Sequence, residues 1–265
     1  GLLKHQLRPT IQAFNTAKLD SIAACGDVNR NVIVSSHPQI SAIHQQIYEY
    51  ADKISTLLLP KTQSYYEVFI DGEKIYERSS EADPLYKDRY LPRKFKIAIA
   101  IPPSNDVDVF TNDIGLIAII ENDVLKGFNI AIGGGLATTH GNPNTYSRLG
   151  SIIGFTDTEE KTLKAVYEIL TVQRDFGNRV DRKLSRLKYT VDKLTVEGFK
   201  KELENRIGFE FEPERKYTFT ERSDRFGWEQ NHQGKWFYTL FVEHGVVKPE
   251  QKQFLYELAQ QDISN

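Results

Sequence analysis

The sequence is poor in sulfur, with one cysteine, Cys25, and no methionine among 265 residues. A single thiol excludes a disulfide framework within the chain. It also excludes a zinc site or an iron–sulfur cluster held by cysteines of this chain alone. Because the first residue is a glycine, Gly1, the lack of methionine favours a fragment of a longer polypeptide.

Long apolar runs are also absent. No stretch approaches the roughly 20 consecutive apolar residues of a membrane span. The N-terminus has neither the charged and apolar regions nor the cleavage site of a secretory signal. These absences favour a cytoplasmic protein with no membrane partner.

Neither sign of charge is in excess, since 34 Lys and Arg oppose 36 Asp and Glu for a formal net charge of −2. This balance argues against a protein that binds nucleic acid over its whole surface. The basic residues are nevertheless concentrated at 89–96 and 174–188. Local anion sites are therefore expected in a chain that is slightly acidic overall.

Apolar residues follow the helical period in some segments and the extended period in others. Helical spacing predicts helices over 2–19, 40–57, 156–173, 179–185, 196–207 and 249–260. Alternation predicts strands over 65–70 and 74–76 joined at Asp71-Gly72, a central hairpin of 114–121 and 125–132, and extended runs at 32–34, 95–101 and 236–242. Because hairpins and helices are interspersed, the sequence predicts the α+β class.

The segment Arg93-Lys94-Phe95-Lys96 opens a predicted strand. Alternation would place Lys94 and Lys96 on one face and Phe95 on the other, so that two ammonium groups converge. Like charges side by side are unfavourable unless an anion neutralises them. A competing interpretation is an exposed sheet edge protected by lysines, which is the commoner use of such a pattern.

Two loops also have the chemistry of anion sites. Arg30 lies among small polar residues, where a guanidinium can present a fork to an anion, although an ordinary turn arginine capped by Asp27 is the simpler interpretation. Gly133, Gly134 and Gly135 permit close backbone approach to a ligand, and their amides are candidate donors to carboxylates or phosphates. A bulge or tight turn explains the glycines equally well.

The basic run 174–188 repeats a cation every three to four residues, which predicts a basic face on a helix or turn. This face is either solvated or binds phosphate-like anions.

Five segments carry a resemblance by their order and spacing. They are Cys-Gly-Asp-Val-Asn-Arg-Asn at 25–31, Leu-Pro-Arg-Lys-Phe-Lys at 91–96, Gly-Gly-Gly-Leu at 133–136 with His-Gly-Asn at 140–142, Gln-Arg-Asp-Phe-Gly-Asn-Arg at 173–179, and Asp-Arg-Phe-Gly-Trp at 224–228. Together they resemble the siroheme-containing nitrite and sulfite reductase family, and within it the sulfite reductase hemoprotein β-components. The resemblance extends over essentially the whole chain.

The resemblance implies cofactors and site residues. Family members carry siroheme coupled to a [4Fe–4S] cluster through a shared cysteine thiolate. By motif, Arg30, Lys94 and Lys96 match three of the four cations that surround the substrate anion. The expected contacts to siroheme carboxylates are Arg93, Lys94, Gly134, Gly135 and Arg186. The cluster cysteines and the fourth cation have no counterpart in this sequence, so no metal ligand is assigned here.

The resemblance also implies a function, which is assimilatory six-electron reduction of sulfite to sulfide. The expected electron donor is an NADPH-dependent flavoprotein α-component, although ferredoxin-dependent relatives share most of these motifs. The chain alone is expected to be inactive. Siroheme nitrite reductases commonly have asparagine where Lys96 stands, which favours sulfite. A nitrite reductase fragment and a non-enzymatic anion- or nucleic-acid-binding module are the alternatives.

The implied fold is the siroheme nitrite/sulfite reductase fold. In it a mixed-sheet α+β domain is inserted between parts of a ferredoxin-like domain. The expected boundaries are 1–23 for an N-terminal helix of the split domain, 24–224 for the siroheme- and sulfite-binding domain, and 225–265 for a returning strand and helix. The ferredoxin-like domain would be incomplete at both ends.

Overall fold

A five-stranded mixed sheet forms the centre of the computed structural model, which describes residues 2–17, 27–61, 67–71, 73–77 and 82–261. The strand order is β1-β4-β5-β6-β7. The strands span β1 Asn29–Ile33, β4 Phe95–Ala100, β5 Ile114–Glu121, β6 Val124–Ile132 and β7 Ser151–Thr156. β1, β4 and β5 run parallel, whereas β5, β6 and β7 are antiparallel neighbours. The predicted α+β class and mixed sheet are confirmed.

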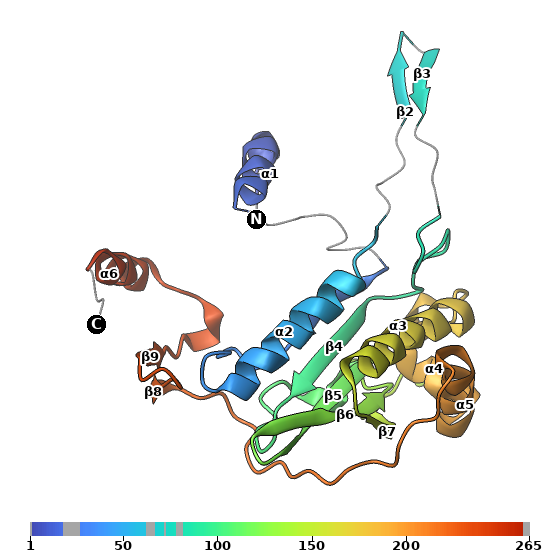
Figure 1. Ribbon diagram of the computed structural model, residues 1–265. Coiled ribbons are helices and arrows are strands. Elements are labelled where there is room, and N and C mark those ends of the chain that lie inside the picture. Colours follow the sequence, from blue (N-terminus) through green and yellow to red (C-terminus); the bar gives the residue numbers. More distant parts are fainter. Residues whose placement is uncertain (1, 18–26, 62–66, 72, 78–81, 262–265) are drawn as a thin grey trace.

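Four helices cover one face of this sheet (Figure 1). They are α2 Ala42–Leu57, α3 Glu159–Phe176, α4 Leu187–Leu194 and α5 Val196–Ile207. Alternate residues of β4, beginning with Phe95, face these helices and are almost fully buried in the main hydrophobic core. This burial of one strand face under helices is the principal source of stability that the fold offers.

The opposite face of the sheet has a smaller apolar cluster built around Ala100, Val109 and Ile117. A 3₁₀ turn, η2 Val109–Thr111, and the extended segment 212–221 cover it. The side chain of Asn129 anchors that segment, because its amide donates to the carbonyl oxygen of Arg215 at 2.7 Å and accepts the Arg215 N–H at 3.0 Å. The chain therefore crosses the back of the sheet before it leaves the domain.

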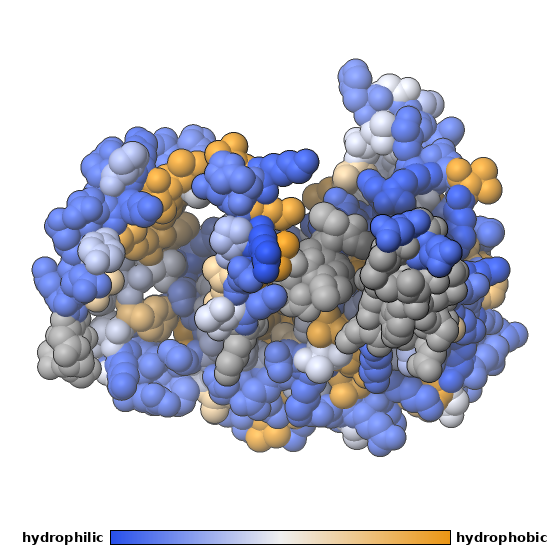
Figure 2. Space-filling model, turned by 90° about the horizontal axis from the view of Figure 1, so that it is seen from above, coloured by the Kyte–Doolittle hydropathy of each residue, from blue (hydrophilic) through white to orange (hydrophobic). Residues whose placement is uncertain are grey.

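The remaining elements lie away from the central sheet (Figure 1). They are η1 Lys4–Gln6, α1 Leu7–Thr16, the hairpin of β2 Glu67–Ile70 and β3 Glu73–Glu77, the hairpin of β8 Gly227–Gln230 and β9 Trp236–Thr239, η4 Glu243–Gly245 and α6 Pro249–Gln260. Apolar side chains are exposed on the C-terminal part, which occupies the left of Figure 2. The ferredoxin-like assignment of these flanking pieces and the three domain boundaries stay predictions.

Most predicted elements are present, with several differences. The helix expected at 179–185 is wrong, because this segment holds only the 3₁₀ turn η3 Arg182–Leu184, and α4 follows it. Strands β7 and β8 were not predicted. The helix expected at 156–173 begins later, because Thr156 ends β7 and the capping residue of α3 is Thr158, whose hydroxyl accepts the Lys161 N–H. Parts of the predictions at 18–26, 65–66 and Gly72 lie outside the described residues.

Candidate functional site

The strand register brings the basic motifs to one end of the sheet. Asn29 pairs with Phe95, Ile97 pairs with Ile114, and Ile114 pairs with Ile132. The starts of the parallel strands β1, β4 and β5 therefore lie beside the end of β6. The segments around 30, 94, 113 and 133 meet there although they are far apart in the sequence.

The two lysines of β4 lie as the alternation predicted. Phe95 is buried in the core, while Lys94 and Lys96 flank it and are partly exposed. The interpretation of these lysines as protection for a sheet edge is wrong, because β4 has a hydrogen-bonded neighbour on each side. Neither ammonium group has a hydrogen bond or an ion pair within the described part of the chain.

Electrostatics show that the cations converge on Lys94. Burial lowers the pKa of Lys94, and the neighbouring positive charges lower it further, in the order Lys96, Arg186, Arg93 and Arg30. Like charges that depress the pKa of a lysine are a source of unfavourable energy, which a bound anion would relieve. The structure thus brings together all five side-chain cations that the sequence assigned to the site.

Arg30 lies on strand β1 and not in the predicted loop, and its side chain is exposed. Its interpretation as a turn arginine capped by Asp27 is wrong, because the Asp27 carboxylate pairs instead with Arg182 at 2.9 Å. The pairing register of β1 shifts between Asn29 and Val32, so alternation alone does not place Arg30, but its charge is among those that lower the pKa of Lys94.

Arg186 is bound to a buried carboxylate. Its Nε donates to Oδ1 of Asp113 at 3.0 Å, and its Nη2 donates to Oδ2 at 2.8 Å. Asp113 is fully buried, and its Oδ2 also accepts the backbone N–H of Lys96 at 3.0 Å. Burial raises the pKa of the Asp113 carboxyl, and the Arg186 guanidinium opposes that rise. Arg186 therefore reaches the site as half of a fixed ion pair.

The backbone amides of Gly134 and Gly135 are bonded within the chain, and the lack of a side chain at Gly134 permits a close backbone approach. The N–H groups of Gly134 and Gly135 donate to the carbonyl oxygens of Asn112 and Arg148 at 3.0 and 2.8 Å. A Cβ on Gly134 would lie 2.2 Å from the carbonyl oxygen of Phe110, whereas one on Gly135 would be 3.4 Å from flexible side-chain atoms. The close approach at Gly134 is thus between two segments of this chain, and contact of either glycine with a ligand stays a prediction.

Lys188 is buried beneath the glycine turn, with 1% of its surface exposed. Its ammonium group donates to the carbonyl oxygens of Gly135 and Ala137 at 3.0 and 2.9 Å, and also to that of Tyr146. It lies 5.0 Å from the centre of the Tyr189 ring. This lysine fixes the loop that follows β6.

A cavity of about 400 Å³ opens among these groups. Basic side chains and threonines dominate its lining: Arg93, Lys94, Arg182, Lys183, Arg186, Lys188, Thr138, Thr139, Thr145, Ala137 and Tyr189. No aspartate or glutamate lines it among the described residues. A volume of this size and a lining of guanidinium, ammonium and hydroxyl groups suit a ligand with several negative oxygens.

The predicted basic face of 174–188 is divided in the structure. Arg174 is buried and bonds to Asp175 and to the Leu85 carbonyl, and Arg179 donates to the carbonyl oxygens of Arg89, Tyr90 and Arg174. These two arginines hold the chain together. Only the later part of the run, from Arg182 onward, lines the cavity.

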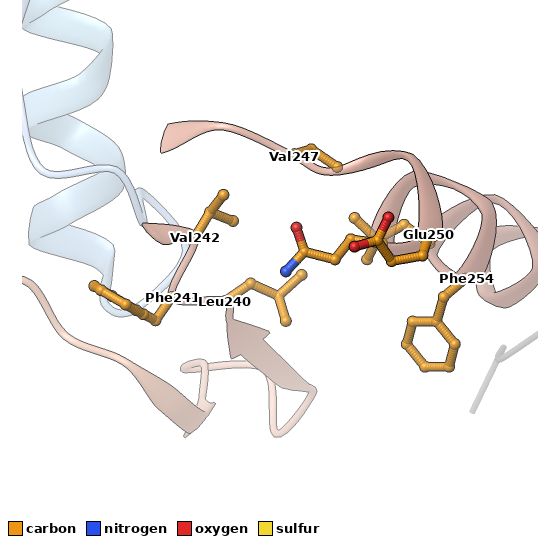
Figure 3. A pocket seen from close by; sticks show the side chains of 8 residues that line it. Leu240, Phe241, Val242, Val247, Glu250 and Phe254 are labelled. Carbon is orange, nitrogen blue, oxygen red and sulfur yellow. The ribbon is translucent and has the colours of Figure 1, made fainter. Parts of the chain in front are cut away.

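A second cavity, of about 300 Å³, has different chemistry (Figure 3). It lies between α6 and the segment after β9, and is lined by Leu240, Phe241, Val242, Val247, Glu250, Gln251, Phe254 and Leu255.

In the described ranges, no three His, Cys, Asp or Glu side chains cluster as a metal site would, and no helix is long and apolar enough to cross a membrane. Cys25 lies outside those ranges.

Sequence reasoning missed Asp113 and the cavity residues Lys183, Thr138, Thr139 and Thr145. The sequence offered one signal for Asp113, which is that it directly precedes an apolar strand. An acidic side chain at such a position is buried with the strand unless it points to solvent. The threonines carry no local signal of this kind.

Known proteins resemble this chain. The family model described as nitrite and sulphite reductase 4Fe-4S domain matches residues 49–211. The sulfite reductase [NADPH] hemoprotein β-component of Leptospira biflexa is 61% identical over 94% of this chain and 45% of its own length. The protein of the same name from Staphylococcus haemolyticus is 50% identical over 94% of this chain and 43% of its own length. This chain therefore spans less than half of these relatives.

A solved structure, that of the Mycobacterium tuberculosis NirA protein, aligns with a TM-score of 0.63 over 88% of this chain and 37% of that one. At 18% identity it supports the fold alone. The family model, in contrast, covers more than half of the 265 residues. The chain belongs to the nitrite and sulphite reductase 4Fe-4S domain family.

Proposed function

We propose that this chain is the siroheme- and sulfite-binding portion of an assimilatory sulfite reductase hemoprotein. The observation that carries the proposal is the cluster of cations at the sheet end, in which Arg93, Lys94 and Lys96 are partly buried and Arg30 is exposed. Arg30, Arg93, Lys94 and Lys96 have no acidic partner within the described residues. Unpaired cations this close together, whose charges add to burial in lowering the pKa of Lys94, indicate a site built for an anion that is not part of the chain.

The donor set fits siroheme, which bears eight carboxylates. Guanidinium groups bind carboxylates with two parallel hydrogen bonds, and lysines supply point charge. The cavity of about 400 Å³ offers both kinds of cation together with threonine hydroxyls. This volume suits a carboxylate-bearing edge of the macrocycle, so Arg93, Lys94 and Arg186 are the residues proposed to hold it.

Arg30, Lys94 and Lys96 are proposed to bind the sulfite dianion. When bound, siroheme with its coupled cluster supplies the electrons, six for each sulfite reduced to sulfide. These three cations at the sheet end would orient the anion and stabilise the negative charge that accumulates on its oxygens. Because positive neighbours lower its pKa, Lys94 releases a proton more readily than an ordinary lysine. It is therefore the best placed of the three to donate protons to departing oxygen atoms.

The whole protein requires groups beyond these residues. The family description names a 4Fe–4S domain, while this sequence has a single cysteine. We therefore propose that other parts of the whole protein supply the cluster ligands, and that this chain alone does not reduce sulfite. The relatives named for NADPH favour a flavoprotein α-component as electron donor, and a cytoplasmic location goes with that assignment.

Nitrite is the second candidate substrate, because the family description includes both reductases. Sulfite is favoured by the names of the relatives and by Lys96, since a second lysine beside Lys94 suits a dianion better than a monoanion. A non-enzymatic nucleic-acid-binding module has less support, because the cavity cations form a compact recess and not an extended basic groove with stacking aromatics.

Titration of the purified chain with siroheme tests the proposal by visible absorption. Binding should shift the siroheme spectrum, and the double variant Lys94→Ala/Lys96→Ala should bind at least about tenfold more weakly, because the charge-assisted contact of Lys94 and the neighbouring positive charge of Lys96 are lost. A double variant that replaces Lys200 and Lys201 of α5 serves as the charge-matched control. An unchanged siroheme spectrum with tight binding of RNA would refute the assignment.

A further inference from the structure

We infer that Asp113 is a positioning residue that pre-forms the anion site, and that it does not serve merely as a counter-charge. The inference rests on the proposed anion-binding function of the cluster. Asp113 lies directly before β5, at the sheet end where the cations meet, and its carboxylate is fully buried. Among the described residues that line the cavity, Arg186 is the one whose side chain is hydrogen-bonded to the Asp113 carboxylate.

The carboxylate joins two segments that each carry a site cation. One is the start of β4, where the Lys96 N–H donates to Oδ2. The other is the start of α4, where the guanidinium of the N-cap residue, Arg186, donates to both carboxylate oxygens. These segments are 17 and 73 residues from Asp113 in the sequence. One side chain thus fixes the relative positions of Lys96 and Arg186.

The hydrogen bonds leave no freedom for an amide in place of the carboxylate. Oδ1 accepts from Arg186 Nε, while Oδ2 accepts from both Arg186 Nη2 and the Lys96 N–H. Asparagine at this position would direct its NH₂ group against a donor in either orientation. The fork of Arg186 or the Lys96 backbone would have to move.

Charge and geometry make opposite predictions for the variant Asp113→Asn. Removal of a negative charge next to the cluster increases the local positive potential, so a role as counter-charge alone predicts tighter anion binding. Loss of the fixed Arg186 and Lys96 geometry predicts weaker binding, because preorganised charge-assisted contacts become misaligned. The sign of the change therefore identifies the role.

The control is Asp27→Asn, which removes the same charge from the same region. Asp27 pairs with Arg182, another cavity cation, but this pair is exposed and fixes no site backbone through the carboxylate. In titrations with siroheme, Asp27→Asn should bind as tightly as the unmodified chain or more tightly. Asp113→Asn should bind on the order of tenfold more weakly. Binding by Asp113→Asn that is equal or tighter overturns the inference.

Amide hydrogen exchange separates this inference from the proposed function. Without siroheme, the Lys96 amide of the unmodified chain should already be protected, and it should exchange at least about tenfold faster in Asp113→Asn. The amide of Ile97, a residue that pairs with strands on both sides, is the internal control. If the unmodified chain does not bind siroheme, the proposed function fails, and Asp113 is then judged on exchange alone. Rapid exchange of the Lys96 amide in the unmodified chain refutes pre-formation, even if Asp113→Asn does not fold.

Discussion

The variant Lys188→Met tests whether the buried ammonium group of Lys188 stabilises the loop between β6 and β7. Methionine keeps the unbranched stem and its packing, but it removes the ammonium group. That group donates to three backbone carbonyls, those of Gly135, Ala137 and Tyr146, and lies over two tyrosine rings. The substitution therefore removes hydrogen bonds and cation–π contacts without creating a large cavity.

The magnitude follows from what each lost contact leaves behind. The Gly135 carbonyl keeps its hydrogen bond from the Arg148 N–H at 3.0 Å, so loss of the Lys188 contact costs about 0.5–1.5 kcal/mol. Ala137 and Tyr146 are exposed residues whose carbonyls can bond to water, so their losses are small. The ring contacts contribute about 1 kcal/mol, and the relief of burying an ammonium group offsets part of the total. A net loss of about 1–2 kcal/mol in unfolding free energy is expected.

Urea denaturation of the two chains measures this difference from the midpoints at an unchanged slope. Lys193→Met is the matched control, because Lys193 lies on the same helix, α4, but is exposed, and it should change stability by less than about 0.5 kcal/mol. If Lys188→Met loses no more stability than this control, the assignment of Lys188 as the residue that fixes the loop is wrong.

Three further predictions concern single residues. In the whole enzyme, Lys96→Asn should reduce kcat/KM for sulfite at least about tenfold more than for nitrite, because the sulfite dianion loses more electrostatic attraction than the nitrite monoanion. Steady-state assays on both substrates measure the two losses. Equal losses would show that Lys96 does not favour sulfite. Burial opposes ionisation of Asp175, but hydrogen bonds from Arg174 and Arg206 hold its pKa at about 2, below the ordinary value of 3.8. The unfolded chain therefore binds the proton more tightly, so Asp175→Asn should lose about 1–2 kcal/mol at pH 6, and this difference should disappear as the pH falls from 4 through 2; urea denaturation at several pH values measures it, and a constant difference would contradict the ion-pair account. Gly134→Ala should lose at least about 2 kcal/mol through its clash with the Phe110 carbonyl, whereas Gly135→Ala should lose less than about 1 kcal/mol; similar midpoints in thermal unfolding would count against the clash.

The parts of the fold that the sequence predicts are those in which local pattern and tertiary environment agree. The β5–β6 hairpin is apolar on both faces and is buried under helices and loops, so its apolar runs signal strands directly. In β7 the signal is interrupted by Gly154, whose φ is +147° and where a Cβ would collide with Phe211. A glycine inside a strand weakens the sequence signal although the close packing requires it.

The helix expected at 179–185 fails for a local reason that a periodicity argument does not include. The side-chain oxygen of Asn178 accepts the backbone N–H groups of Val180 and Asp181, and Asp181 in turn caps Lys183. These bonds satisfy the backbone in turns and compete with the helix. The segment therefore presents Arg182 and Lys183 from a turn at the mouth of the cavity.

The sequence could not reveal which charged side chains of the site are buried. Lys188 and Lys193 are indistinguishable by local composition, yet one is buried and bonded to three carbonyls while the other is exposed. The difference arises from the loop that follows β6, which is brought over α4 only by tertiary folding. The same holds for Asp113, whose partners come from distant segments.

The pairing of the cations explains how the site stays available to a ligand. Arg186 is neutralised by Asp113 and Lys188 is bound to carbonyls, so these two groups form a fixed frame, whereas Arg182 forms an exposed pair with Asp27. The cations without an acidic partner among the described residues are Arg30, Arg93, Lys94, Lys96 and Lys183. Burial, and after it the charges of Lys96, Arg186, Arg93 and Arg30, lower the pKa of Lys94, so the ammonium form of Lys94 is unfavourable without a bound anion. An anion that binds them must therefore stabilise the folded chain, by about 2.7 kcal/mol at a concentration one hundred times its Kd. It must also raise the pKa of Lys94, since the bound negative charge favours the ammonium form.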